Sequence, residues 1–351
     1  MIISRTPFRI SFFGGGTDYP VWYREEGGAV IATTIDKYCY LSCRHLPPFF
    51  DYKTRIVYGK VEIVTSNDQI AHPAVRGVLD YLGIQDGVEI HHDGDLPART
   101  GLGSSSSFTV GLLNACYALQ RVMADKRQLA VEAIHVEQEL LKENVGSQDQ
   151  VSAAYGGFNW VEFAPDGQFS VSPIILPRER LEALQTHLML FFTGFSRTAS
   201  DIAAAQIQAT AEKRRELRRM REMVNASKAV LAGTADLRSF GTLLHEAWEV
   251  KRGLTRTISS PEIDEIYEAA QRAGAIGGKL LGAGGGGFML FFVRPEDQAS
   301  VRKALQRLLC VPFRFESTGS QIIFYEPDGL DGAPERPKAQ QRRWIPAAVS
   351  A

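Results

Sequence analysis

The feature of this sequence that most constrains its fold is a turn of glycines and serines that runs directly into a helical segment. Residues 97–107 read Pro-Ala-Arg-Thr-Gly-Leu-Gly-Ser-Ser-Ser-Ser, and residues 108–119 have helical character. Gly101 and Gly103 permit a left-handed backbone and close approach to a ligand, while the free N–H groups and dipole of a first helical turn favour a polyanion. No Gly-Lys-Ser or Gly-Lys-Thr follows, so this is not a Walker A loop. The segment predicts a phosphate-binding loop, and a serine-rich N-cap on an ordinary helix remains the alternative.

Two further glycine-rich segments flank this loop in the chain. Residues 7–19 read Pro-Phe-Arg-Ile-Ser-Phe-Phe-Gly-Gly-Gly-Thr-Asp-Tyr, and residues 277–287 read Gly-Gly-Lys-Leu-Leu-Gly-Ala-Gly-Gly-Gly-Gly before the apolar run 288–293. Three such segments in this order resemble the GHMP small-molecule kinases, the family of galactokinase, homoserine kinase and mevalonate kinase. The resemblance spans residues 1–325, and its most specific part is the central segment 97–107.

The resemblance implies an α+β, two-domain GHMP kinase fold with the active site in the cleft between the domains. Residues 1–180 would form a domain like domain 2 of ribosomal protein S5, and residues 181–327 a ferredoxin-like domain. The polar segment 328–351 is expected to be a mobile tail. Hydrophobic periodicity predicts single helices over 127–143 and 199–231, and strands over 311–316 and 321–325 that belong to the second unit.

Composition and charge narrow the classes of partner. The chain has 351 residues, a length typical of about two domains. Charged residues make up 23% and the formal net charge is −1, so no excess of positive charge favours nucleic acid or an anionic membrane. The apolar runs are far shorter than the ~20 residues of a membrane span, and the start has no signal-peptide pattern. These observations predict a cytoplasmic protein, and they leave its oligomeric state open.

The resemblance implies that ATP and Mg²⁺ bind at the glycine-serine loop. A hard cation such as Mg²⁺ prefers oxygen ligands. Glu137 corresponds to the family's acidic metal ligand, with Ser104 or Ser105 as the hydroxyl ligand, and an exposed helix acid is the alternative for Glu137. The expected ATP-binding residues are Pro97, Gly101, Leu102, Gly103, Ser104, Ser105, Ser106, Ser107, Gly284 and Gly285.

The turn at residues 145–150 and the first strand supply the expected catalytic pair. Asp149 matches the aspartate that serves as general base in galactokinase, so it would accept the proton of the acceptor hydroxyl. Arg9 aligns with the family's active-site arginine, which would stabilise the ionised forms of that hydroxyl and of the aspartate. Because some family members lack a base, catalysis by positioning alone stays open.

The resemblance also implies a sugar 1-kinase. Thr17 and Asp18 match the element that binds a sugar hydroxyl, and Gly15 and Gly16 stand where galactokinase carries Glu-His. That change removes a carboxylate and opens space for a longer sugar with a distal phosphate, for which Arg197 is the foremost cationic candidate. Several segments are most similar to kinases of D-glycero-D-manno-heptose 7-phosphate, which make the 1,7-bisphosphate for surface polysaccharides. A hexose 1-kinase for fucose, galactose or an N-acetylhexosamine, and a non-catalytic sugar sensor, are the alternatives.

Overall fold

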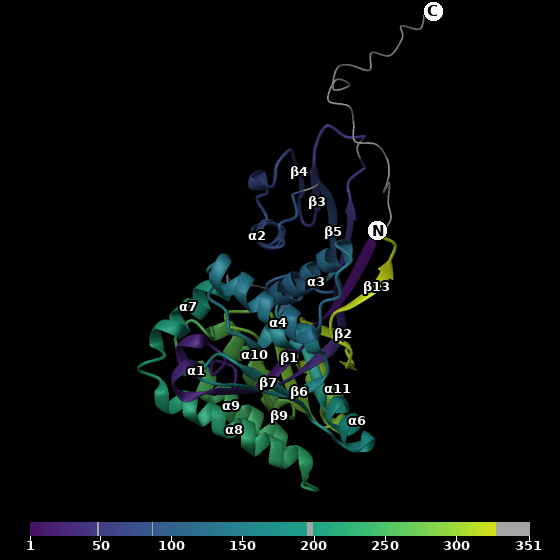
Figure 1. Ribbon diagram of the computed structural model, residues 1–351. Helices are drawn as coiled ribbons and strands as arrows, with labels where there is room; N and C mark the ends of the chain where they lie inside the picture. The colour runs from purple at the N-terminus through teal and green to yellow at the C-terminus, as the bar shows by residue number, and fades with distance from the viewer. Residues whose placement is uncertain (48, 86, 195–198, 328–351) are drawn as a thin grey trace, which may run out of the picture.

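The computed structural model describes residues 1–47, 49–85, 87–194 and 199–327. It contains two sheets, one of nine strands and one of four (Figure 1). The predicted tail 328–351 and Arg197 lie outside the described residues.

The nine-stranded sheet is organised around one long central strand, β2. On one side β2 (Gly28–His45) pairs along its length with β1 (Ile2–Phe13). On the other side its first half pairs with β6 (Phe158–Phe163) and its second half with β5 (Val88–Gly94). The remaining members of this sheet are β3 (Thr54–Val57), β4 (Val61–Val64), β7 (Phe169–Pro173), β12 (Phe315–Glu316) and β13 (Gln321–Tyr325). Most of β1 and the first half of β2 are buried, as expected for strands covered on both faces.

Helix α3 (Ser104–Leu119) packs against β1 and β2 and carries the glycine-serine segment at its N-terminus. It is buried almost throughout, which explains why its sequence shows little alternation of polar and apolar faces. The other helices of this half are α1 (Pro20–Glu26), η1 (Asn67–Gln69), α2 (Pro73–Tyr81), α4 (Lys126–His135), a π-helical turn η2 (Val136–Leu140) and α5 (Gln148–Tyr155).

The four-stranded sheet has the order β11-β8-β10-β9 and is antiparallel throughout. Its strands are β8 (Leu188–Phe192), β9 (Ala275–Leu280), β10 (Phe288–Val293) and β11 (Leu309–Val311). Numbered within this unit the strand order is 4-1-3-2, and helices follow the first and third strands. This is the predicted ferredoxin-like arrangement. Its helices are α6 (Arg178–Thr186), α7 (Ala199–Ala209), α8 (Arg214–Ala232), α9 (Arg238–Arg252), α10 (Pro261–Arg272), η3 (Pro295–Asp297) and α11 (Gln298–Ala304).

A cluster of aromatic rings joins the two sheets. Phe240 on α9 lies edge-on to Phe12 and Phe13 at the end of β1, with ring centroids 5.4 and 5.1 Å apart. The same ring lies 6.1 Å from Phe292 on β10. Because all four side chains are buried, both halves share one hydrophobic core, and this core sets how the second unit sits against the end of β1.

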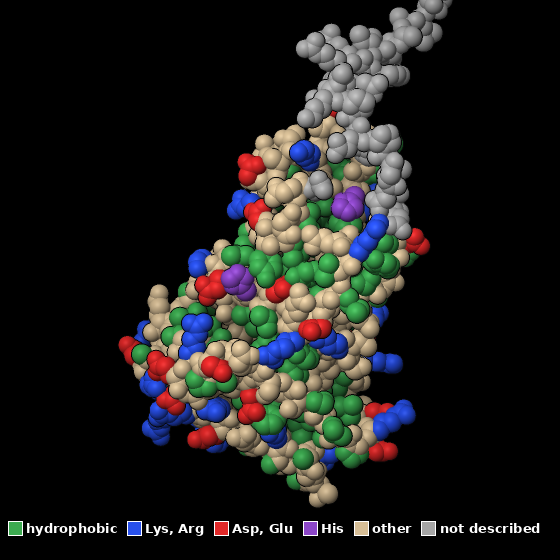
Figure 2. Space-filling model, viewed as in Figure 1, with side chains coloured by type: hydrophobic (Ala, Val, Ile, Leu, Met, Phe, Trp, Pro, Cys, Tyr) green, Lys and Arg blue, Asp and Glu red, His purple; other side chains and the backbone are tan. Residues whose placement is uncertain are grey.

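The charged segment of α8 forms ion pairs with its neighbours. Arg214 binds Glu25 and Glu26 of α1, and Arg219 binds Glu246 of α9. Figure 2 shows Lys and Arg side chains interspersed with Asp and Glu on this part of the surface. The mixed charges of this segment connect α8 to both adjoining helices.

Three sequence predictions differ from the structure. The strands near 315 and 321, expected in the second unit, pair instead with β2 and β1 of the first sheet, so the yellow β13 lies beside the purple β1 in Figure 1. The single helix expected over 199–231 is two helices, with a break at residues 210–213. The helix expected over 127–143 ends in a π-helical turn. Periodicity misses all three because pairing partners and local changes of helical hydrogen bonding leave no periodic signal. The domain boundary near residue 180 stays a prediction.

Where the chain returns to the first sheet, its backbone touches the end of α5. A Cβ on Gly156, which has φ +66°, would lie 1.9 Å from the backbone nitrogen of Gly319. Gly167 has a similar φ of +86° but open space around it.

We therefore expect Gly156→Ala to destabilise the fold by about 1–3 kcal/mol more than Gly167→Ala. The left-handed backbone penalises both substitutions, but only the first adds steric overlap. Urea denaturation of the two variants measures the difference, and equal losses of stability would contradict this account of the contact.

Candidate active site

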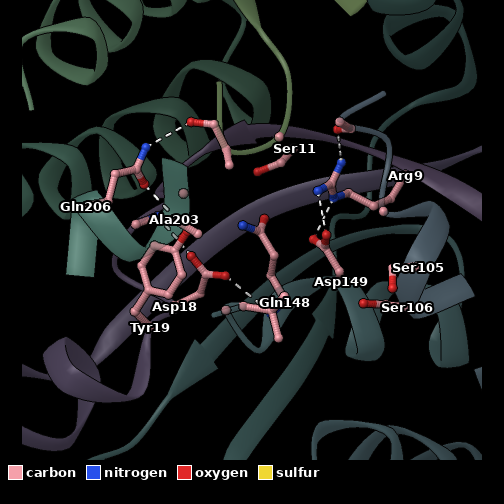
Figure 3. Close-up of a pocket in the computed structure, with 18 of the residues that line it drawn as sticks. Arg9, Ser11, Asp18, Tyr19, Ser105, Ser106, Gln148, Asp149, Ala203 and Gln206 are labelled. Carbon is pink, nitrogen blue, oxygen red and sulfur yellow. Dashed lines mark hydrogen bonds and ion pairs between the residues drawn. The ribbon is translucent and has the colours of Figure 1, made fainter. Parts of the chain in front are cut away.

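The candidate site is a cavity of about 150 Å³ between the two units. The first half contributes the end of β1, the turn after it, the glycine-serine loop and the start of α5, and the second half contributes α7, α9 and the glycine loop after β9. In Figure 3, Gln148 lies between Asp18 and Asp149, while Tyr19 and Gln206 close one side. The three glycine-rich segments of the sequence therefore meet at one place.

The glycine-serine loop and the third glycine loop touch backbone to backbone. A Cβ on Gly282 would lie 2.4 Å from the Cα of Gly101, and a Cβ on Gly101 would lie 2.4 Å from the carbonyl oxygen of Leu281. Both glycines have positive φ, +69° and +85°. Next to this contact, the Phe288 N–H donates to the Thr100 carbonyl at 3.2 Å. Glycine is required here because any side chain would separate the two loops.

Arg9 and Asp149 form a two-pronged ion pair at the cavity wall. The Arg9 Nε and Nη2 donate to the two carboxylate oxygens of Asp149 at 2.7 and 2.6 Å, while Nη1 donates to the Gly101 carbonyl at 2.6 Å. Arg9 is only 4% exposed and Asp149 is 24% exposed. The planar guanidinium thus fixes the carboxylate relative to the glycine-serine loop. The strand register shifts just before Arg9, between Pro7 and Phe8, and such irregularities re-aim side chains next to active sites.

Asp18 is almost fully buried and lies against the turn that precedes α5. Its carboxylate accepts hydrogen bonds from the Gly16 N–H at 2.8 Å and the Gln148 N–H at 3.4 Å. A Cβ on Gly146 would lie 1.9 Å from a carboxylate oxygen of Asp18, so this glycine permits the close approach. Burial raises the pKa of Asp18, and the charge of Asp149 adds to the rise.

Glu137 lies on the π-helical turn beneath the start of α3 and is fully buried. One carboxylate oxygen accepts from the Ser106 hydroxyl at 2.8 Å and from the Gln150 amide, while the other accepts no hydrogen bond in the part of the chain described. Burial raises the pKa of Glu137 to about 7, and the nearby hydroxyls of Thr109 and Ser106 and the Gln150 amide offset only part of the rise. The prediction of an exposed helix acid as the alternative is wrong, because this carboxylate is enclosed beside the loop.

Glu137 and the neighbouring serine hydroxyls fit a hard cation in their donor chemistry, because all of their ligand atoms are oxygens and one carboxylate oxygen is unpartnered. The described residues contain no group of three or more His, Cys, Asp or Glu side chains that could hold a metal unaided. A cation bound here would therefore need further oxygens from a phosphate ligand.

The four serines differ in their surroundings. The helix begins at Ser104 rather than at residue 108, with Gly103 as its N-cap. Ser104 accepts a hydrogen bond from the Arg99 N–H at 3.0 Å, and Ser107 donates to the Pro7 carbonyl at 2.9 Å. Ser106 holds Glu137, whereas the sequence analysis favoured Ser104 or Ser105 as its partner in metal binding. Only the first three serines line the cavity, because Ser107 already faces into the first sheet.

The cavity brings together most of the residues that the sequence analysis named. Those that line it are Arg9, Gly15, Gly16, Asp18, Gly101, Gly103, Ser104, Ser105, Ser106 and Asp149. Those that do not are Pro97, Leu102, Thr17, Ser107, Glu137, Gly284 and Gly285. Thr17 is a structural residue, since its hydroxyl donates to the Gly14 and Ala29 carbonyls. The roles of all these residues stay predictions.

Two buried lysines of the cavity were missed. Lys279 lies on β9 and Lys251 on α9, and they are 4% and 6% exposed. Lys279 lies within the third glycine-rich segment, which was interpreted from its glycines alone. Lys251 continues the buried stripe of α9 formed by Leu244, Ala247 and Trp248, so the signal that would have found it is a cation on the apolar face of a helix.

Comparisons with known proteins decide the family. The model of the GHMP kinases N terminal domain matches residues 69–157, and the GHMP kinases C terminal model matches residues 226–309. The chain belongs to the GHMP kinases. It is therefore a phosphotransferase with an alcohol group as acceptor, and the predicted two-domain fold is confirmed.

Three relatives of this GHMP kinase are informative. It is 29% identical to D-glycero-alpha-D-manno-heptose 7-phosphate kinase of Campylobacter jejuni over 325 residues, which cover 87% of this chain and 93% of that protein. A crystal structure of a D-glycero-D-manno-heptose 1-phosphate kinase from Bacteroides thetaiotaomicron superposes with a TM-score of 0.74 at 25% identity and covers 91% and 98% of the two chains. L-fucokinase/L-fucose-1-P guanylyltransferase of Bacteroides fragilis is 26% identical over 344 residues, 86% of this chain and 35% of that protein.

No helix in the described ranges combines the length and the apolar composition needed to cross a membrane.

The raised pKa of Glu137 predicts how folding stability changes with pH. A carboxyl group that titrates near 4.5 when unfolded and near 7 when folded binds more protons in the folded state over that window, so folding stability falls as pH rises through it. At about 1.4 kcal/mol per pKa unit, we expect the ligand-free protein to lose on the order of 3 kcal/mol between pH 5 and 8 through this group. Glu137→Gln should lack this component of the loss.

Chemical denaturation of both proteins at the two pH values measures it, with Glu139→Gln, an exposed neighbour on the same turn, as the control. A difference in stability between wild type and Glu137→Gln that does not change with pH would show that Glu137 titrates normally.

Proposed function

We propose that this protein is a cytoplasmic, ATP- and Mg²⁺-dependent sugar 1-kinase. Its substrate is D-glycero-D-manno-heptose 7-phosphate, which it phosphorylates on the anomeric hydroxyl to give the 1,7-bisphosphate. The observation that carries the proposal is the pair Gly15 and Gly16, which line the cavity next to the buried Asp18 and place no side chain there. Arg9 and Asp149 line the same cavity. The similarity to heptose kinases over most of the chain supports it.

The phosphate groups of ATP bind at the cavity-lining part of the glycine-serine loop. The N–H groups at the start of α3 and the dipole of this 16-residue helix favour the anion. Mg²⁺, held by Glu137 with a serine hydroxyl, would neutralise charge on the phosphates. Because Glu137 accepts a hydrogen bond from the Ser106 hydroxyl, these two side chains would hold the cation together.

Asp149 accepts the proton of the acceptor hydroxyl. The sugar oxygen forms a bond to the γ-phosphorus while the bond to the leaving ADP oxygen breaks, and the hydroxyl proton moves to the carboxylate. The ion pair with Arg9 holds this carboxylate in one orientation. Positioning of this carboxylate therefore contributes as well as proton transfer.

Asp18 orients the sugar through its hydroxyls. Gly15 opens the space beside it: a Cβ there would lie 3.6 Å from the Gln148 amide nitrogen, so a longer side chain would project into the cavity. With glycine at both positions, the carbon chain of a heptose extends over this floor without a fixed negative charge beneath its phosphate.

A distal phosphate needs a cation. Arg44 and Arg55 do not supply it near the candidate site, because both pair with Glu89 in a separate hollow next to Met1. Lys213 lies closer to the candidate site. It lines a small hollow next to the main cavity, and Gly16, Tyr19 and Gln206 line both. Its ammonium nitrogen is 3.2 Å from a Glu216 carboxylate oxygen, and its side chain is 30% exposed. We therefore propose Lys213 as a partner of the sugar's distal phosphate, in addition to Arg197.

A hexose 1-kinase is the alternative, favoured by the similarity to the L-fucokinase of Bacteroides fragilis. A non-catalytic sugar sensor is disfavoured, because the Arg9–Asp149 pair and the buried Glu137 have no evident use in a protein that only binds sugar.

A substrate panel tests the proposal. Release of ADP is measured with heptose 7-phosphate, the unphosphorylated heptose, fucose, galactose and N-acetylhexosamines. We expect the heptose 7-phosphate to have the highest kcat/KM. Lys213→Ala should raise the KM for it about 10-fold or more, the usual worth of a charged hydrogen bond, without changing the KM for ATP.

Arg215→Ala, at an exposed cation in the first turn of the same helix α8, serves as the matched control. Equal or better turnover of an unphosphorylated hexose would transfer the assignment to the hexose 1-kinase class.

The role of Asp149 has its own test. Asp149→Asn should lower kcat by roughly 10² to 10⁴, the range for loss of a general base, with nucleotide affinity nearly unchanged. Steady-state kinetics and calorimetric titration with ADP separate the two effects. A variant that keeps most of its activity would favour catalysis by positioning alone.

A further inference from the structure

Lys251 is a buried cation that has no carboxylate partner within hydrogen-bonding distance among the residues described. Its ammonium group donates to the carbonyl oxygens of Leu280 and Gly282 at 3.0 and 2.5 Å, and the side chain lines the cavity. An ammonium group has three N–H donors, so one remains for an acceptor inside the cavity. A buried charge satisfied only by neutral carbonyls is costly, and an anion arriving from the cavity would remove that cost.

The charges around Lys251 belong to elements of both units. Arg9 on β1 and Lys279 on β9 repel it, while Asp18 in the turn after β1 and Asp149 on α5 attract it. Burial outweighs these attractions and, together with Arg9, lowers the pKa of Lys251 to about 7. The three cations exceed the two carboxylates in number, so the cavity has an unbalanced positive charge when all five groups are ionised.

The position of Lys251 relative to the loops identifies where such an anion binds. Lys251 holds the Gly282 carbonyl, Arg9 holds the Gly101 carbonyl, and these two glycines touch. The two cations therefore stand on either side of the point where the glycine-serine loop meets the third glycine loop. Arg9 is also ion-paired with Asp149. The contact between the two loops therefore lies close to both the phosphate-binding loop and the proposed base.

We propose that Lys251 binds the γ-phosphoryl group of ATP during its transfer, as a second cation opposite Arg9. The third N–H of the ammonium group donates to an equatorial phosphoryl oxygen and stabilises the charge on the group in transit. The inference rests on ATP as the donor in the proposed function, and it does not depend on which sugar is the acceptor.

A purely structural role gives different consequences. If Lys251 only tied α9 to the third glycine loop, its removal would loosen that loop, lower thermal stability and weaken every nucleotide alike. If it binds the γ-phosphoryl group, its removal distinguishes ligands that carry this group from ligands that lack it.

The test compares Mg-AMPPNP with Mg-ADP on the full chain by calorimetry, without any sugar. We expect Lys251→Met to weaken AMPPNP binding by about 10- to 100-fold, as for loss of a hydrogen bond between charged groups, and to change ADP binding less than about twofold. With an active acceptor, kcat should fall by about 10² or more. Lys251→Arg should recover part of the AMPPNP affinity, and Lys303→Met, at an exposed lysine of α11, is the control.

Equal weakening of both nucleotides by Lys251→Met, or no weakening of AMPPNP, overturns the inference. A wild-type protein that binds neither nucleotide would instead contradict the proposed donor, and the inference would fall with it.

A second measurement uses wild type and is decisive even if Lys251→Met fails to fold. At pH 8 the lysine is mostly neutral, and a bound phosphoryl anion raises its pKa, so binding takes up a proton. Titrations of AMPPNP in buffers of different ionisation enthalpy should show more proton uptake for wild type than titrations of ADP, and Lys251→Arg should abolish that excess. The absence of an excess over ADP in wild type would contradict the proposal. Because any proton released by Glu137 accompanies both Mg-nucleotides, it cancels in this comparison.

Discussion

The structure depends on a backbone contact that only glycine permits. Gly101 in the first unit and Gly282 in the second lie so close that a Cβ on either would overlap the other's loop. The contact brings the N-terminus of α3, where phosphate is expected, to the glycine loop after β9. Two side chains reinforce this backbone contact, because Arg9 and Lys251 each donate a hydrogen bond to a carbonyl of one of the touching loops.

The cavity around this contact holds charges that the fold itself does not balance. Burial raises the pKa values of Glu137 and Asp18 and lowers those of Lys251 and Lys279. Each shift means that the ionised form is disfavoured until a partner arrives. In the proposed function the partners are the phosphates and their cation, so the groups that lower stability in the free protein would strengthen binding. Packing of the shared hydrophobic core, which includes the Phe240 cluster, offsets this loss of folding stability.

The family resemblance carried by the three glycine-rich segments implied the fold class and the cleft between the domains, which pattern alone did not supply. It also named Arg9, Asp18 and Asp149, and the structure brings all three to one cavity. The pattern of residues placed the start of α3 four residues late, since serine is common before helices as well as in their first turn. It overlooked Lys251 and Lys279, because a lysine is expected on the surface unless its neighbours are known.

What the sequence by itself determined is the local chemistry: the left-handed glycines, the helix start that favours anions, the apolar strands of the second sheet and the residue types of the candidate site. The tertiary structure alone decided which of these come together. The return of β13 to the edge of β1 and the approach of Arg9 and Lys251 to two touching loops join residues more than 100 positions apart. The enclosure of Glu137 under α3 distinguishes it from the exposed Glu139 on the same turn. The physical reason is that burial and charge pairing depend on distances in space, which periodicity and motif spacing do not contain.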